Sequence, residues 1–215
     1  MPASIAVQIA AVRAEMETRP PGLVRHVLRV LEEAIALAGY WDVDPGRVEL
    51  ATWGHDLFRA HAPAEQLRLA REAGIAVDPA DEASPVFLHG PIAAGVLRER
   101  FGVVDDDVVA AVRDHTLGLA EMPLLAKVLL IADKVERNKR DRAPLMREIR
   151  LLARRDLDTA LLCWADWKWV DERTRGWGSH PLHWAARVAW VAEHHADAAL
   201  PGRVSAAAFA AAARE

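Results

Sequence analysis

The sequence is poor in cysteine and has no strong excess of charge of either sign. Only one of the 215 residues, Cys163, is a cysteine, so the chain can form neither an internal disulfide bond nor a thiolate metal cluster. The 27 basic and 31 acidic residues leave a formal net charge of -4, which argues against a broad cationic surface for duplex DNA or anionic lipid. The scarcity of cysteine fits a reducing compartment, and we expect a cytoplasmic protein.

Long apolar segments and the short motifs of several enzyme classes are also missing. No uncharged apolar run reaches the roughly 18 to 20 residues that a membrane span needs. The N-terminal residues lack the continuous apolar core of an export signal. There is no glycine-rich phosphate loop, H-E-x-x-H zinc helix, G-x-S-x-G elbow or Glu-x-x-His pair, so those nucleophilic and metal-binding designs have no support.

Helical periodicity is present along almost the whole chain. Apolar residues recur at three- and four-residue spacing, proline and glycine divide the chain into helix-sized segments, and no long stretch alternates with a period of two. The pattern predicts an all-α fold with an N-terminal helix or extension (1–21), one helical domain (22–195) and an Ala-rich C-terminal tail (196–215). The expected helices cover about 4–17, 23–38, a segment beginning at 44–45, 64–73, 87–100, 105–115, 124–137, 145–154, 157–174 and 182–195.

Polar side chains interrupt several helix faces that otherwise read as core. They are His26, the adjacent pair His55 and Asp56, His115, and Asp133, with His89 just before a proline. A lone histidine on an apolar face is more often a hydrogen-bonded core residue, whereas a buried aspartate needs a strong partner or a metal. If the helices converge, four imidazoles and two carboxylates form a ligand set suited to divalent metals, and Asp56 could bridge two ions. A core hydrogen-bond network without metal is the alternative.

Two further clusters stand out in the C-terminal half. A basic run after Asp133 could receive a phosphate chain or could be a solvated helix end. It consists of Lys134, Arg137, Lys139, Arg140 and Arg142. Six tryptophans favour packing in a core or a subunit interface, and hence a possible homodimer, over stacking on a base. They are Trp164, Trp167, Trp169, Trp177, Trp184 and Trp190.

The order of the polar residues resembles the HD-domain metal-dependent phosphohydrolases. Finer matches over roughly residues 22–191 resemble the bacterial YqeK-type HD proteins; these are G-H-D-L-F-R at 54–59, L-H-G-P at 88–91, H-T-L-G at 115–118, I-A-D-K-V-E at 131–136 and H-P-L at 180–182. This resemblance implies a single HD-domain helical bundle with a di-metal site between helices. It also implies a symmetrical dinucleoside tetraphosphatase that cleaves diadenosine tetraphosphate into two ADP through a metal-activated water. Iron is the expected metal, with manganese or zinc as alternatives.

Residue roles follow from the same resemblance. The metal ligands implied are His26, His55, Asp56, His89, His115 and Asp133, of which Asp56, His89, His115 and Asp133 are the expected catalytic residues. Substrate contacts are expected from Arg59, His89, His115, Thr116, Asp133, Lys139, Ser179, His180 and Pro181, the last three in a segment that closes over the nucleotide. This chain departs from the family where Arg59 replaces lysine, Lys139 replaces arginine and His183 replaces threonine.

Other functions share the same ligands. Another HD-type phosphohydrolase acting on nucleoside monophosphates or guanosine tetraphosphate would need the same metal residues. The alternative to an enzyme is a nucleotide-sensing metal-binding module without turnover. The expected partners are a dinucleoside polyphosphate and ADP, with no duplex nucleic acid and no membrane.

Overall fold

The computed structural model describes residues 4–198, and this part of the chain is helical without a strand. The all-α prediction is therefore confirmed. The first seven elements are α1 (Ile5–Glu17), α2 (Pro21–Trp41), α3 (Pro45–Gly54), α4 (Pro63–Glu72), α5 (Pro79–Ala83), the 3-10 helix η1 (Pro85–Leu88) and α6 (His89–Glu99). They are followed by α7 (Asp106–Asp114), α8 (Leu124–Val135), α9 (Arg137–Arg142), α10 (Leu145–Ala153), α11 (Leu157–Thr174) and α12 (Pro181–Ala198).

Proline and aspartate define where many of these helices begin. Proline is the first residue of α2, α3, α4, α5, η1 and α12, where its missing N–H would have had no helical partner. The Asp44 side chain accepts a hydrogen bond from the backbone of Arg47, and Asp105 caps α7 in the same way. The helix start expected at residues 44–45 is thus confirmed.

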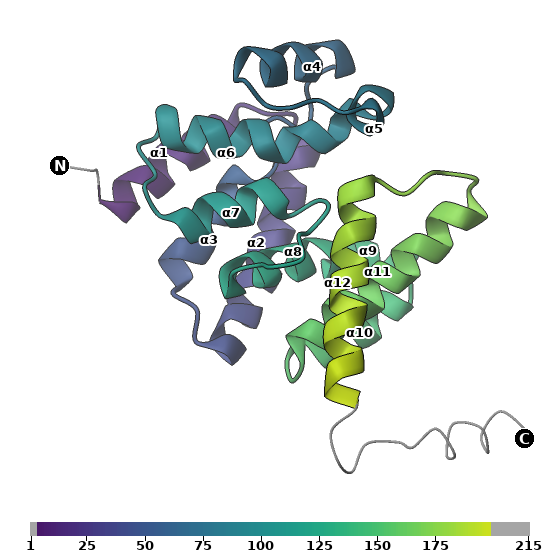
Figure 1. The fold of residues 1–215 in the computed structure, drawn as a ribbon. Helices are drawn as coiled ribbons and strands as arrows, with labels where there is room; N and C mark the ends of the chain where they lie inside the picture. The colour runs from purple at the N-terminus through teal and green to yellow at the C-terminus, as the bar shows by residue number, and fades with distance from the viewer. Residues whose placement is uncertain (1–3, 199–215) are drawn as a thin grey trace, which may run out of the picture.

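Helix α8 forms the centre of the molecule (Figure 1). It packs against α2, α7, α10 and α11, and nearly all of its side chains are buried. The N-terminal helix α1 packs on α3, where Val12 and Met16 are fully buried in the same core. The core therefore holds the ends of α2, α3 and α7 at fixed positions beside α8.

The structure differs from the predicted helices in three places. Helix α2 continues through Gly39 to Trp41 and ends only at Asp42, whose φ of 53° is left-handed. The segment expected as one helix from 124 to 137 divides because Glu136 is extended, with ψ of 157°, and caps α9 instead. The short elements α5 and η1 were not expected.

The C-terminal helices bury only part of their aromatic residues. Trp164 and Trp190 lie in the core, whereas Trp177 and Trp184 are 57% and 43% exposed. Within residues 4–198, no helix has the length and apolar character needed to cross a membrane. Most of the predicted Ala-rich tail lies outside the described residues.

Candidate metal centre and phosphate-binding cavity

Three histidines occupy equivalent positions at the ends of helices. His55 is the C-cap of α3, His89 of η1 and His115 of α7. In each case Nδ1 hydrogen-bonds to the backbone carbonyl three residues earlier, which lies in the last turn of the helix. These carbonyls belong to Thr52 (2.7 Å), Val86 and Val112 (2.7 Å). Since a carbonyl only accepts, Nδ1 of each ring is the donor in this contact, and Nε2 is left to face the site.

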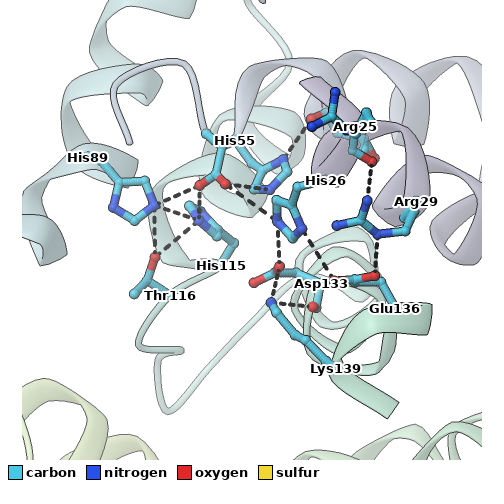
Figure 2. A network of polar contacts seen from close by, with 12 residues as sticks. Arg25, His26, Arg29, His55, His89, His115, Thr116, Asp133, Glu136 and Lys139 are labelled. Carbon is cyan, nitrogen blue, oxygen red and sulfur yellow. Dashed lines mark hydrogen bonds and ion pairs between the residues drawn. The ribbon is translucent and has the colours of Figure 1, made fainter. Parts of the chain in front are cut away.

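All three Nε2 atoms lie within 3.6 Å of the carboxylate of Asp56, which follows His55 and is 5% exposed. Figure 2 shows the rings of His55, His89 and His115 pointing toward one another. Its Oδ1 lies 3.0 Å from Nε2 of His89 and 3.6 Å from Nε2 of His115. Its Oδ2 lies 3.5 Å from Nε2 of His55 and 3.5 Å from Nε2 of His26, which comes from α2. One carboxylate therefore joins two histidine pairs, each with ligand atoms close enough to share an ion.

The donor set fits divalent cations. Nε2 of His89 and Nε2 of His115 are only 3.0 Å apart, and Nε2 of His55 is buried with no hydrogen-bond partner. Burial lowers the pKa of His115 to about 3 and also lowers the pKa of His55, so both of these rings are neutral near neutral pH and their Nε2 atoms present lone pairs. A cation between the rings would satisfy these lone pairs, and nitrogen with carboxylate oxygen suits first-row transition metals.

Asp133 on α8 completes the cluster from the opposite side. Its Oδ1 lies 3.1 Å from Nε2 of His26, and its two oxygens accept hydrogen bonds from Lys134 (2.6 Å) and Lys139 (2.5 Å). Burial raises the pKa of Asp133, but Lys134, Lys139 and His26 together bring it well below its ordinary value. The carboxylate is therefore ionised and available to a cation.

Glu136 is a site residue that the sequence reasoning did not assign. It is 2% exposed, accepts a hydrogen bond of 2.7 Å from Arg29, and has one oxygen 3.6 Å from Nδ1 of His26. A carboxylate behind a metal-binding histidine orients the ring and raises its basicity. The sequence feature that pointed to Glu136 as a site residue was its position three residues after Asp133, at the end of an apolar helix.

A cavity of about 470 Å³ opens beside this cluster. Its walls include His26, Asp56, His115, Thr116 and Asp133. They also include five cationic side chains, which are Arg29, Arg59, Lys134, Lys139 and Arg142. Burial lowers the pKa of Lys134 to about 8. The cavity therefore combines a candidate metal centre with a wall of positive charge suited to phosphate oxygens.

The structure brings most, though not all, of the predicted site residues together. The six expected metal ligands converge, Thr116 Oγ lies 3.3 Å from Nε2 of His89 and 3.1 Å from Nε2 of His115, and Arg59 and Lys139 line the cavity. Ser179, His180 and Pro181 do not line it: the Ser179 hydroxyl donates to Glu172, and Nε2 of His180 lies 3.2 Å from Asp81. Their contact with nucleotide stays a prediction.

Comparison with known proteins agrees with this geometry. The HD domain family matches residues 23–138, more than half of the chain. The chain belongs to the HD domain family. Its HD domain carries the whole candidate metal centre, because every expected ligand from His26 to Asp133 falls within the matched residues. HD domains bind divalent metals, and the histidine and aspartate clusters of this chain could hold such ions.

Similar proteins extend the comparison beyond this HD domain. A Halalkalibacterium halodurans protein named symmetrical bis(5'-nucleosyl)-tetraphosphatase is 35% identical over 64% of this chain and 72% of its own length. A Staphylococcus aureus protein of the same name is 33% identical over 59% of this chain and 64% of its own length. A Clostridium acetobutylicum structure, described as a predicted HD superfamily hydrolase involved in NAD metabolism, covers 86% of this chain and 97% of its own with 25% identity and a TM-score of 0.80. The predicted HD-domain fold is confirmed.

Proposed function

We propose that this HD-domain chain is a metal-dependent phosphohydrolase that cleaves diadenosine tetraphosphate symmetrically into two ADP. The observation that carries the proposal is the Asp56 carboxylate, which faces four imidazole nitrogens at the edge of a cavity lined by cations. The shared name of the similar proteins supplies the substrate. Such a site suits an anionic phosphate chain, because ligands for cations and free cationic side chains meet in one cavity.

When bound, divalent metal ions supply an activated water and neutralise charge on the phosphate oxygens. The chain's own residues position the substrate. Arg59 lies in the cavity wall and offers a planar fork to two phosphate oxygens. Lys139 and the Thr116 hydroxyl contact the same region, so we assign both to phosphate oxygens beside the reacting phosphorus. ADP leaves as an anion and needs little protonation, so no dedicated general acid is required.

Iron is the metal that we propose, as a pair of ions. Two ligand groups support a pair: His26 with His55 and Asp56, and His89 with His115 and Asp56. Imidazole and carboxylate ligands also accept manganese and zinc. Metal analysis of protein purified without added metal, followed by reconstitution with each ion, tests this part. A single ion per chain, or full activity with zinc alone, would contradict it.

We also propose a homodimer formed through α12. Its outward side carries large apolar residues, which are Trp184, Val188 and Val191, each 41–49% exposed. Arg187, the charged residue among them, is held by Asp166 at 2.7 Å. A helix that is apolar on both sides is normally covered. Light scattering should give twice the chain mass, and Val188→Asp should give monomers, whereas Val104→Asp at another exposed valine should not.

A cytoplasmic location stays a prediction that rests on the scarcity of cysteine.

Product analysis tests the proposed reaction. Metal-loaded protein is incubated with diadenosine tetraphosphate, and the products are separated by anion exchange. We expect ADP alone. ATP with AMP would keep hydrolysis but contradict symmetrical cleavage. Tight binding without products would favour a nucleotide-sensing module, and turnover of nucleoside monophosphates or guanosine tetraphosphate instead would indicate another HD-type reaction.

A further inference from the structure

The five cations that line the cavity are not equivalent. Arg29 is held by Glu136 at 2.7 Å, and Lys134 and Lys139 both donate to Asp133. Arg59 and Arg142 remain, and within residues 4–198 neither of these exposed side chains forms an ion pair. These two guanidinium groups are therefore free to bind a ligand without breaking an existing interaction.

Helix α9 fixes where Arg142 lies relative to the metal centre. Asn138, Lys139 and Arg142 all line the cavity, and their spacing of three and four residues places them on one face of the helix. Arg140 faces away from them and holds α9 in place by donating to Glu33 and to a carbonyl of α8. Arg142 is thus one turn beyond Lys139, roughly 5 Å farther along α9 from Asp133.

A phosphate chain that starts at the metal centre and passes Lys139 next meets Arg142. We propose that Arg142 binds the phosphates outside the reacting centre and makes the cavity selective for long phosphate chains. A guanidinium presents its donors in a fixed planar fork that matches two phosphate oxygens, whereas an ammonium acts as a point charge. The proposal rests on the proposed function and adds a residue that sets substrate length. It also separates Arg142 from the rest of the basic run: Arg137, exposed on the same helix, does not line the cavity.

Binding of nucleotides with increasing numbers of phosphates tests this role. Metal-loaded protein is titrated calorimetrically with AMP, ADP and the β,γ-methylene analogue of ATP. We expect wild type to bind more tightly with each added phosphate. Arg142→Ala should weaken binding of the ATP analogue by about tenfold or more while leaving AMP binding unchanged. The affinity of Arg142→Lys for the ATP analogue should lie between those of wild type and Arg142→Ala. Arg137→Ala, the matched control, should bind all three nucleotides as wild type does.

Kinetics provide the second readout. With diadenosine tetraphosphate, Arg142→Ala should raise KM and leave kcat nearly unchanged, because a contact away from the reacting phosphorus contributes equally to ground and transition states. Equal weakening of AMP and the ATP analogue, or no weakening of either, would overturn the proposal. The titration needs no turnover, so a wild-type protein that makes no ADP but keeps the increase in affinity would contradict the proposed function alone.

Discussion

Replacing Asp56 with asparagine removes one charge that both histidine pairs share. In the structure Oδ1 faces His89 and His115, and Oδ2 faces His26 and His55, at 3.0–3.6 Å. Changes to residues that only support a metal ligand cost about 10- to 100-fold in metal affinity. Loss of a ligand to both ions should therefore lower the combined affinity at least ~10²- to 10⁴-fold, or about 3–5.5 kcal/mol.

The assay has three readouts on the same sample: metal per chain by mass spectrometry, helicity by circular dichroism, and ADP formation. Asp56→Asn should lose metal and turnover together while keeping its helices. Asp114→Asn is the matched control, because Asp114 is equally buried at 6% exposure but pairs with Arg113 outside the site. An Asp56→Asn protein with a full metal complement and normal turnover would refute the reasoning.

Three further changes test other parts of the structure. Glu136→Gln should lower metal affinity about tenfold or more, measured by metal titration, because it supports His26 from behind. Gly118→Ala should lower the free energy of unfolding by about 2 kcal/mol or more, because its φ is +73° and an added Cβ would lie 2.7 Å from Trp190. Burial lowers the pKa of His183 from 6.5 to about 4. In urea unfolding at several pH values, this ring should contribute roughly 3 kcal/mol to the stability lost as pH decreases from about 6.5 to about 4, in addition to the losses from His55 and His115.

Each of these predictions has its own control. Glu72→Gln, at an exposed glutamate paired with Arg68, should not change metal affinity. Gly95→Ala should be neutral or stabilising, because the helix position has no atom within 4 Å of an added Cβ. For the pH prediction, the unfolded state binds a proton that the buried ring does not, and His183→Gln should remove that contribution and make the slope of stability against pH shallower. Unchanged slopes in that variant would assign the loss of stability to other groups.

The long helices could be predicted from the sequence because periodicity and capping residues agree there. Asp44 before Pro45 marked the start of α3 correctly. Gly39 did not end α2, because the packing of α2 on α3 and α8 outweighs the roughly 1 kcal/mol that a helical glycine costs. Short elements such as α5 depend on local capping by Asp78 and carry too few residues to show periodicity.

The metal ligands were predictable as polar residues on apolar faces, but their supporting residues were not. Glu136 is the N-cap of α9, a position that acidic residues commonly take at a surface, and only the packing of α2 against α8 brings it behind His26. The basic run shows the same limit. Arg140 and Arg142 are two residues apart, yet one is held by buried Glu33 and the other is free beside the cavity. The orientation of α9 determines which arginine is held and which is free, and sequence spacing alone does not fix that orientation.

The ligands come from five helices that are far apart along the chain, since His26 and Asp133 enclose most of the HD domain between them. An ion held by both would act as a reversible cross-link across that whole length. Unfolding would disperse its ligands, so only the native state would keep the metal. The temperature at which the protein unfolds should then rise with the concentration of free metal, and a cell short of that metal would hold a less stable enzyme as well as a less active one.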